Sequence, residues 1–580
     1  MKRRDEVWAK VRGKWDIVVV GGGITGAGVF AHASRLGLKC LLIERRDFGW
    51  GTSSRSGKLV HGGLRYLKQG QWRMTLHSVH ERERLLRLYP GLIRRLGFLM
   101  PLYDADQTSR LLLKTGLALY DGMAGRRAHR WMGASTLTAA APVIRRAGLI
   151  GGYRFEDAQT DDARLVWRVM EEGRACGGIS LNYAAAVSID QDRGGETEHV
   201  TVEDVLTGQI AEVEAPVVVN ATGVWVDDLR TAHSLRVRMR RLRGSHLLFP
   251  HWRFPLSQAV SFAHPEDGRP VYAVPWEGAT LVGTTDIDHD QSLASEPCIT
   301  HSELDYLFAA LDSMFPSLNL ALTDTLSAYS GVRSVIDTGK SNPSDESREH
   351  AIWAERGVIS VIGGKLTTYR LLAAQTLTVA KPLLRRAAPQ NAEHGDPPRP
   401  QEGTRRSWSA QPYEREGSSS PQVVGGLSIA RRAYLLSDER TATWERAADW
   451  ENAGRARVRQ RLLDRYGRDI GVRLWREAAE AERKVLADTD VSTAELKWAA
   501  GHEDVAHLDD LLLRRTRLGL VANQGGLPLL PRLRTAIQAE MGWTDAEWRR
   551  EVERYRDLWL VAYSPGPRAA SAREGGGGHL

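Results

Sequence analysis

Three glycines near the start of this sequence have the spacing that binds a pyrophosphate. Gly21, Gly23 and Gly26 are arranged as G-x-G-x-x-G. The first permits a tight turn, the second lets the backbone approach the phosphates, and the third lets a helix pack closely on a strand. Glu44 follows at the separation where a carboxylate binds a ribose hydroxyl. The spacing predicts a bound dinucleotide, and a purely structural βαβ turn is the alternative.

The elements around these glycines are the ones that such a site needs. The β-branched run 17–20 predicts a strand, and residues 29–36 predict a helix. After a turn at Gly37, residues 40–44 predict a second strand that ends in the carboxylate of Glu44. The start of the helix offers N–H groups and the positive end of its dipole to the phosphates.

The segment 48–67 is rich in glycine and hydroxyl residues, and it predicts a loop that presents N–H groups and hydroxyls to a ligand. Lys58 adds a point charge, and Arg65 adds a fork that suits phosphate or carboxylate. Directly after a dinucleotide-binding unit, such a loop lies where the flavin or nicotinamide end of a cofactor extends. A long surface loop is the alternative.

Two later apolar strands end in small or polar residues. Residues 217–219 run into 220–223, a pattern that in flavoproteins lies beside the first glycine turn. Residues 358–362 run into Gly363, Gly364 and Lys365 at the start of a helix. This second case repeats the physics of the first element, because backbone N–H groups gather at a helix N-terminus.

Composition limits the class of protein. A chain of 580 residues is too long for one core and predicts two or more domains. The net charge of +8 suits binding to nucleic acid, to an anionic membrane or to an anionic substrate, or reflects only a mildly basic surface.

Three cysteines support neither a disulfide framework nor a zinc site, so a reducing cytoplasm is expected. A charged N-terminus argues against a signal peptide. No run approaches the roughly 20 apolar residues of a membrane span, so membrane contact would be peripheral.

The rest of the chain predicts a sheet followed by helices. The amphipathic run 108–123 could lie on a membrane, although burial in its own domain is the commoner outcome. Residues 242–326 predict a mostly antiparallel sheet, and 387–426 a polar linker. The helical region beyond it contains capping boxes at Ser492 with Glu495 and at Thr544 with Glu547, and the tail from residue 564 is expected to be disordered.

Together, and in this order, the motifs resemble the FAD-dependent glycerol-3-phosphate dehydrogenases of respiratory metabolism. The likeness covers about residues 15 to 380 and is weaker at Leu511 to Thr516. Gly57 stands where the family usually has serine. Ser334 stands where the family normally has a proline directly after the arginine, which is Arg333 here. The matching stretches are 19–28, 51–54, 58–67, 161–166, 220–223, 244–246, 283–286, 329–333 and 363–370.

The resemblance implies an α/β fold. It consists of a Rossmann-like FAD-binding domain of the glutathione-reductase or amino-acid-oxidase type, an antiparallel-sheet substrate domain and an all-α C-terminal domain. The implied boundaries are an extension at 1–15, FAD segments at about 16–110, 150–230 and 325–386, substrate segments at about 110–150 and 231–325, a linker at 387–425, helices at 426–563 and a tail at 564–580.

The resemblance implies oxidation of sn-glycerol 3-phosphate to dihydroxyacetone phosphate, with hydride passing to FAD and electrons to a quinone. His246, Arg333 and Lys365 are the implied catalytic residues, with His246 as the base because a neutral imidazole takes a proton at neutral pH. For His246, the alternative is a structural role. Arg348 could instead form a surface ion pair, and Lys365 could contact only the flavin carbonyls. The implied substrate-binding residues are Arg65, Tyr66, His246, Thr284, Arg333 and Arg348.

FAD is the expected cofactor, and no metal is expected. The implied FAD-binding residues are Gly21, Gly23, Gly26, Glu44, Thr52, Ser53, Lys58, Gly62, Gly63, Leu64, Val187, Ala221, Thr222, Gly223, Gly364, Lys365, Leu366 and Thr367. Expected partners besides the substrate are a quinone and an anionic membrane surface, and a homodimer stays open.

Three other functions compete. A glycerol-3-phosphate oxidase, which passes electrons to oxygen, would differ from the dehydrogenase only in access to the flavin. An amine or amino-acid oxidase of the same fold is a more distant alternative, because the several arginines favour a phosphate substrate. A nucleic-acid-binding flavoprotein would need a basic patch with interleaved aromatics. The C-terminal tryptophans have helical spacing among apolar residues, which favours core packing and no nucleic acid. They are Trp444, Trp450, Trp475, Trp498, Trp543, Trp548 and Trp559.

Overall fold

A six-stranded sheet carries the first glycine turn. The computed structural model describes residues 2–64, 67, 70–106, 110–191, 197–231, 239–337, 339–340, 346, 350–355, 357–386 and 450–565. In it, this sheet is parallel except at β19. Its strands, in spatial order, are β19 (Ala351–Glu355), β20 (Val358–Ile362), β12 (Val218–Asn220), β2 (Ile17–Val20), β3 (Cys40–Glu44) and β8 (Ile179–Asn182).

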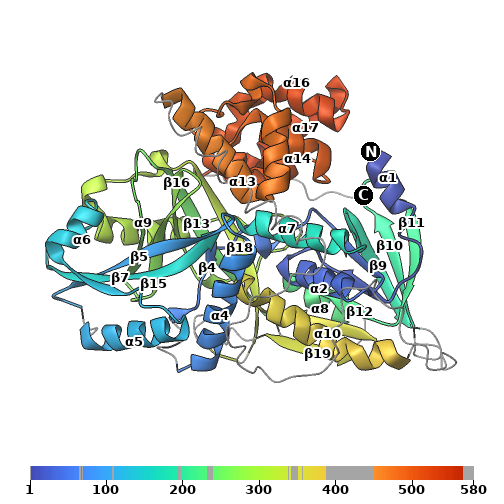
Figure 1. Ribbon diagram of the computed structural model, residues 1–580, viewed down its shortest axis with the longest axis horizontal. Helices are drawn as coiled ribbons and strands as arrows, with labels where there is room; N and C mark the ends of the chain where they lie inside the picture. Colours follow the sequence, from blue (N-terminus) through green and yellow to red (C-terminus); the bar gives the residue numbers. More distant parts are fainter. Residues whose placement is uncertain are drawn as a thin grey trace, which may run out of the picture.

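Both faces of this sheet are buried, as expected for parallel strands. Ile17 and Val19 of β2 face one apolar cluster, which also contains residues of the helices. Val18 and Val20 face the other cluster, which they share with a four-stranded sheet. The helices are α2 (Ile24–Arg35), α7 (Asp162–Ala175) and α10 (Tyr369–Arg386). The four-stranded sheet has the order β1 (Gly13–Lys14), β11 (Ile210–Ala215), β10 (Glu198–Asp204) and β9 (Ala184–Gln191), and α1 (Lys2–Trp8) lies next to it (Figure 1).

A ten-stranded, mostly antiparallel sheet forms the other half of the molecule (Figure 1). Among its described strands, only β14 and β5 pair in parallel. The helices α9 (His301–Met314) and α6 (Ala134–Ala140) pack on it in one apolar cluster. Its strands are β4 (Leu59–Val60), β5 (Ile93–Tyr103), β6 (Arg130–Gly133), β7 (Leu149–Thr160), β13 (Met239–Pro250), β14 (Ala259–Ala263), β15 (Pro270–Trp276), β16 (Ala279–Gly283), β17 (Ile287–Asp288) and β18 (Ser327–Ile336).

The strands β5 and β7 belong to this second sheet, although the boundaries expected at about residues 110 and 150 put them with the FAD segments. They form the longest ladder between neighbours in the sheet, from Ile93 opposite Thr160 to Tyr103 opposite Leu149. Two helices lie below them in Figure 1, α4 (Trp72–Leu88) and α5 (Arg110–Met123).

The C-terminal domain is helical and lies at the top of Figure 1, above α7 and the strands β13 and β16. Ser492 and Thr544 cap the predicted helix starts, since each hydroxyl accepts the N–H three residues on. The predicted capping box is complete at Thr544, whereas the carboxylate of Glu495 accepts from Arg461 and Arg465. Trp548 and Trp559 are buried. The predicted linker, 387–425, lies outside the described residues, as do 426–449 and the tail beyond residue 565. The elements are α13 (Trp450–Glu477), α14 (Thr493–His502), η8 (Asp510–Arg515), α15 (Leu518–Val521), η9 (Asn523–Leu529), α16 (Leu530–Met541) and α17 (Asp545–Ala562).

The predicted architecture is thus confirmed: an α/β domain with a parallel sheet, a largely antiparallel second sheet and a helical C-terminal domain. Among the described residues, none of the helices combines the length and the apolar character needed to cross a bilayer.

Candidate active site

The glycine turn lies where the carboxyl ends of three parallel strands meet. Val20 is opposite Asn220, which is in turn opposite Ser360, so β2, β12 and β20 end at one edge. Gly21 has φ +111°, and a Cβ on it would lie 2.6 Å from the carbonyl oxygen of Ala221. A Cβ on Gly26 would lie 1.9 Å from the carbonyl oxygen of Gly21. These contacts leave room for backbone only, which is the condition for close approach of a pyrophosphate.

Two polar side chains support this turn. Glu44, at the end of β3, accepts hydrogen bonds from the N–H groups of Gly22 (2.6 Å) and Arg46 (2.8 Å). Burial raises the pKa of its carboxyl group. The hydroxyl of Ser53 accepts the N–H of Ile24 at 3.0 Å, which ties the 52–54 turn to the first residue of α2. Gly23 precedes that helix as its N-cap and has no side chain with which to cover it.

The loop after this turn is held by side chains from remote segments. The hydroxyl of Thr52 donates to the carbonyl of Val332 on β18. The N–H of Gly62 donates to the hydroxyl of Tyr120 (2.9 Å) and to Asp157 (3.1 Å). Gly63 has φ +78°. Leu64 is the last residue described before Arg65 and Tyr66, which both lie outside the described part of the chain, as does Arg348.

Lys58 was expected to contact the cofactor, and the structure places its ammonium group inside the protein. The Nζ atom donates to the carbonyl of Ser54 at 2.6 Å and to both carboxylate oxygens of Asp162 at 2.9 Å. Burial lowers the pKa of Lys58 to about 8, although the charge of Asp162 opposes that shift.

The remaining predicted FAD residues lie mostly at the ends of β12 and β20. Ala221 is buried, and the hydroxyl of Thr222 donates to Asn220 at 2.7 Å. Gly223 and Gly364 have positive φ angles of 65° and 98°. Lys365 precedes the turn Leu366–Thr368, in which the hydroxyl of Thr367 donates to the carbonyl of His61 at 3.3 Å. Val187 differs: it is on β9 of the four-stranded sheet with a 57% exposed side chain, so its backbone would have to make the contact.

His246 lies in the middle of the second sheet, between Gly283 on β16 and Tyr329 on β18. Its ring stacks on Tyr329 with 4.8 Å between centroids. A Cβ on Gly57 would lie 3.6 Å from His246 Nε2, so the loop that contains Gly57 approaches the Nε2 edge of the imidazole ring. Burial, followed by the positive charges of Lys58 and Arg333, lowers the pKa of His246 to about 3. The imidazole is therefore neutral at physiological pH.

Arg333 and Thr284 lie beside His246. A Cβ on Gly244 would lie 2.4 Å from Thr284 Oγ1 and 3.4 Å from Arg333 Nη2, so the missing side chain at 244 leaves room between the two. Arg333 Nη2 donates to Asp286 at 2.7 Å, and Arg269 lies 3.5 Å from the same carboxylate. The described residues His246, Thr284 and Arg333 thus come together from β13, from the residue that follows β16, and from β18.

A buried carboxylate behind the sheet fixes the neighbours of these residues. Glu303 on α9 accepts the hydroxyls of Ser245 and Thr285, each at 2.7 Å, and pairs with Arg243 at 3.0 Å. Burial alone would raise the pKa of Glu303, but the hydrogen bond from Thr285 and the charge of Arg243 bring it below its ordinary value. This network joins α9 to β13, which carries His246, and to the segment after β16 that contains Thr284.

The roles of Asp286, Tyr329 and Glu303 are not predicted from the sequence. The first two stand inside matching motifs, 283–286 and 329–333, and the motifs were the only signal that could have found them. Glu303 forms a capping box with Thr300, which is a local signal of a helix start and says nothing of Ser245.

Comparison with known proteins agrees with this geometry. Residues 16–370 match the family model described as FAD dependent oxidoreductase, and residues 431–548 match the C-terminal domain of alpha-glycerophosphate oxidase. The aerobic glycerol-3-phosphate dehydrogenase of Staphylococcus aureus is 36% identical over 391 residues, covering 66% of this chain and 70% of the relative. That of Staphylococcus saprophyticus is 37% identical over 368 residues, covering 62% of this chain and 66% of the relative.

Two solved structures are similar as well. The glycerol-3-phosphate dehydrogenase of Bacillus halodurans, complexed with FAD, has a TM-score of 0.69 and 27% identity, covering 97% of this chain and 98% of that one. The L-alpha-glycerophosphate oxidase of Mycoplasma pneumoniae, with FAD bound, has a TM-score of 0.50 and 16% identity, covering 64% of this chain and 95% of that one. The second likeness shows the fold alone. The chain therefore belongs to the family of FAD-dependent oxidoreductases that includes the aerobic glycerol-3-phosphate dehydrogenases.

Proposed function

We propose that this enzyme oxidises sn-glycerol 3-phosphate to dihydroxyacetone phosphate. The main support is that the neutral, buried imidazole of His246 and the guanidinium of Arg333 lie close together, beside the loop that contains Gly57. FAD, when bound, accepts the hydride of the carbinol carbon. The relatives named glycerol-3-phosphate dehydrogenase support the choice of substrate.

Arg333 is the proposed phosphate-binding residue. A guanidinium group presents several donors in a fixed fork, which suits a phosphate dianion. Asp286 orients this guanidinium through Nη2, as a hydrogen-bonded carboxylate commonly does for a ligand-binding arginine. Arg65 and Arg348 stay predictions for the same role, and Thr284, Tyr66 and Lys365 stay predictions for the oxygen of the reacting carbon.

His246 is the proposed base. Hydride loss leaves the carbinol proton to be removed, and Nε2 is the ring nitrogen that faces Gly57. The pKa of about 3 is set partly by the charges of Lys58 and Arg333. A phosphate dianion bound at Arg333 adds negative charge nearby, which raises the proton affinity of His246 when the substrate is in place.

We propose a quinone as the electron acceptor, as the aerobic dehydrogenase names of the relatives suggest. Oxygen is the second candidate, because residues 431–548 match the C-terminal domain of an oxidase. Turnover with a soluble quinone and with oxygen, compared in the same preparation, separates the two acceptors. An enzyme that turns over faster with oxygen and releases peroxide would overturn the quinone assignment.

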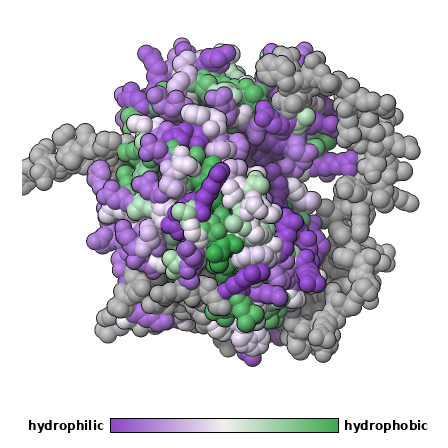
Figure 2. Space-filling view, turned by 90° about the vertical axis from the view of Figure 1, so that its left-hand side faces the viewer, coloured by the Kyte–Doolittle hydropathy of each residue, from purple (hydrophilic) through white to green (hydrophobic). Residues whose placement is uncertain are grey.

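We propose peripheral binding to an anionic membrane on the cytoplasmic side, through α5. Three leucines of this helix are exposed: Leu111 (71%), Leu112 (63%) and Leu119 (52%). Figure 2 looks onto the end of the molecule that carries α5 and α6, and apolar patches are visible there among charged residues. Exposed leucines beside Lys114 suit an interfacial helix.

Flotation with anionic vesicles tests this surface. Replacing Leu111 and Leu112 by Gln should release the protein from vesicles without loss of turnover with a soluble acceptor. Unchanged flotation would remove α5 from this role. Sedimentation of the wild-type protein tests separately whether it forms a homodimer.

A substrate screen tests the reaction itself. Purified FAD-loaded protein should turn over glycerol 3-phosphate with an artificial acceptor, and should be far less active with glycerol, which lacks the phosphate. Turnover of an amine or amino acid in preference to glycerol 3-phosphate would contradict the proposal and favour the amine-oxidase alternative.

A further inference from the structure

One arginine of the C-terminal domain reaches the loop beside His246. Arg517 directly precedes α15 and has a side chain that is 1% exposed. Its Nε donates to Asp161 at 2.9 Å, its Nη2 donates to Asp162, and its Nη1 donates to the carbonyl of Leu513 at 2.7 Å. The guanidinium therefore joins the helical domain to the start of α7.

Asp162 carries the connection into the loop 54–58. Its carboxylate accepts the N–H of Ser56 at 3.0 Å and the hydroxyl of Ser56 at 2.7 Å. It also accepts the ammonium of Lys58 at 2.9 Å. The carbonyl of Ser54 accepts the same ammonium at 2.6 Å and Arg517 Nη1 at 3.4 Å. Three positions of the loop thus depend on one buried carboxylate and the arginine that balances its charge.

The loop in turn contacts the side chains around the proposed base. The hydroxyl of Tyr329 donates to the carbonyl of Ser56 at 2.7 Å, and the ring of Tyr329 stacks on His246. The ammonium of Lys58 lies 4.7 Å from the centroid of the same ring. Gly57, between these two loop residues, faces His246 Nε2. A shift of the loop would therefore change the surroundings of the imidazole.

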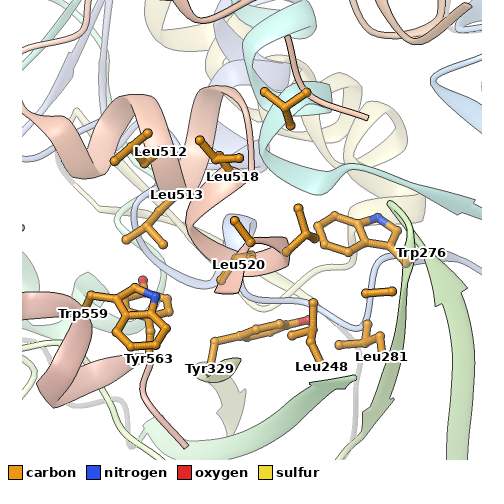
Figure 3. Close-up of a cluster of buried hydrophobic side chains, with 14 of the residues drawn as sticks. Leu248, Trp276, Leu281, Tyr329, Leu512, Leu513, Leu518, Leu520, Trp559 and Tyr563 are labelled. Carbon is orange, nitrogen blue, oxygen red and sulfur yellow. The ribbon is translucent and has the colours of Figure 1, made fainter. Parts of the chain in front are cut away.

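The helical domain also packs directly on the strand that carries Tyr329 and Arg333. The hydroxyl of Ser327 donates to the carbonyl of Leu520 at 2.7 Å, and the N–H of Ala328 donates to the carbonyl of Tyr563 at 2.8 Å. Figure 3 shows Leu520 over the ring of Tyr329, with Leu248 next to it. These residues belong to one buried apolar cluster that crosses the domain boundary.

We propose that Arg517 is a positioning residue for the oxidation step, and that the C-terminal domain thereby completes the active site. It acts by holding Asp162, and through it Ser56 and Lys58, against Tyr329 and His246. If Arg517 were removed, Asp162 would keep Lys58 as a partner, but the buried pair of carboxylates Asp161 and Asp162 would lose the cation that bridges them. Because a buried carboxylate cluster that loses one positive charge is destabilised, the loop would shift. The nature of the step rests on the proposed function.

Arg517→Gln and Arg517→Lys in the full-length, FAD-loaded protein test this inference. Arg164 supplies the matched control, because it is equally buried at the same boundary and pairs with Glu503 at 2.6 Å. The readouts are hydrogen exchange at the amides of Ser56 and Lys58, and the rate of flavin reduction at saturating glycerol 3-phosphate.

In Arg517→Gln, the two amides should exchange faster and the reduction rate should fall about 10- to 100-fold, the range that a displacement of about 1 Å produces. The substrate concentration for half-maximal rate should change much less, because Arg333 is untouched. Arg517→Lys should restore part of both losses. Arg164→Gln should lower the unfolding temperature without either change.

A wild-type reduction rate in Arg517→Gln would overturn the inference, as would identical exchange and rates in Arg517→Gln and Arg164→Gln. If Arg517→Gln fails to fold, the same comparison is made with Arg517→Lys. If glycerol 3-phosphate does not reduce the wild-type flavin, the proposed function fails. Amide exchange then still decides whether Arg517 holds the loop.

Discussion

The glycine turn and the corner around His246 are built in opposite ways. At the turn, Gly21 and Gly26 bring backbone against backbone, and the supporting contacts lie within residues 21–53 except for Ala221. At the corner, buried side chains from five distant segments meet, and charge holds them together. The segments are 54–58, 161–162, 244–246, 329–333 and the C-terminal Arg517. The glycine turn is thus encoded mainly by residues close together in the chain, whereas the corner depends on segments from the whole chain.

The largest effect is expected at the turn. Gly26→Ala places a Cβ 1.9 Å from the carbonyl oxygen of Gly21, so α2 must move away from β2. The phosphates would then lose the helix N-terminus, and the purified protein should carry no FAD, measured by its visible absorption. Gly122→Ala, where a Cβ meets nothing within 4 Å, is the control and should stay yellow. A yellow Gly26→Ala protein would show that the backbone contact is not needed for binding.

The next effect concerns the corner alone. Arg333→Ala should keep its FAD but lower kcat/KM for glycerol 3-phosphate by about 10²-fold, since a hydrogen bond to a charged group contributes roughly 1.5–3 kcal/mol. Steady-state kinetics with an artificial acceptor measures this. Arg253→Ala removes a comparable pair with Asp324, at 2.8 Å, and should leave kcat/KM unchanged. Loss of FAD from Arg333→Ala would make the residue a structural one.

A smaller effect is expected from the base. His246→Gln should retain FAD and slow anaerobic flavin reduction by about 10²-fold, the usual contribution of a positioned general base. Stopped-flow mixing with saturating glycerol 3-phosphate gives the rate. An unchanged rate would take the base role from His246 and leave it a stacking partner of Tyr329.

The smallest effect is a pH dependence of stability. The pKa of His246 is about 3 in the folded protein and 6.5 ordinarily, so between these values the unfolded chain binds a proton that the folded chain does not. This contribution to stability is present above pH 6.5 and lost as pH falls towards 3. By pH 5 wild type should have lost up to about 2 kcal/mol more than His246→Gln.

The unfolding temperatures of the two proteins at pH 8 and pH 5 test this, and the wild-type value should fall further. Equal falls in both proteins would mean that His246 titrates near its ordinary pKa in the folded state.

The same contrast explains what the sequence could predict. The turn, its strands and the helix caps at Ser492 and Thr544 follow from residues close together in the chain, and the structure agrees. His246 and Arg333 were found through motifs, and the structure brings them together. The carboxylate that holds Lys58 could not be predicted, because Asp162 lies 104 residues away along the chain.

The sheet boundaries show the same limit. Residues 93–103 and 149–160 have the apolar character of any buried strand, and only their pairing assigns them to the second sheet. The role of Arg517 depends on its contacts with Asp161 and Asp162, which lie 356 and 355 positions earlier in the chain. No local pattern encodes such a separation.

The flavin spectrum of the purified wild-type protein, recorded after anaerobic mixing with glycerol 3-phosphate, shows whether this substrate reduces the enzyme. We expect the visible absorption to bleach rapidly and to return when a quinone is added. A flavin that stays oxidised with glycerol 3-phosphate, in protein that an artificial reductant bleaches, would contradict this expectation.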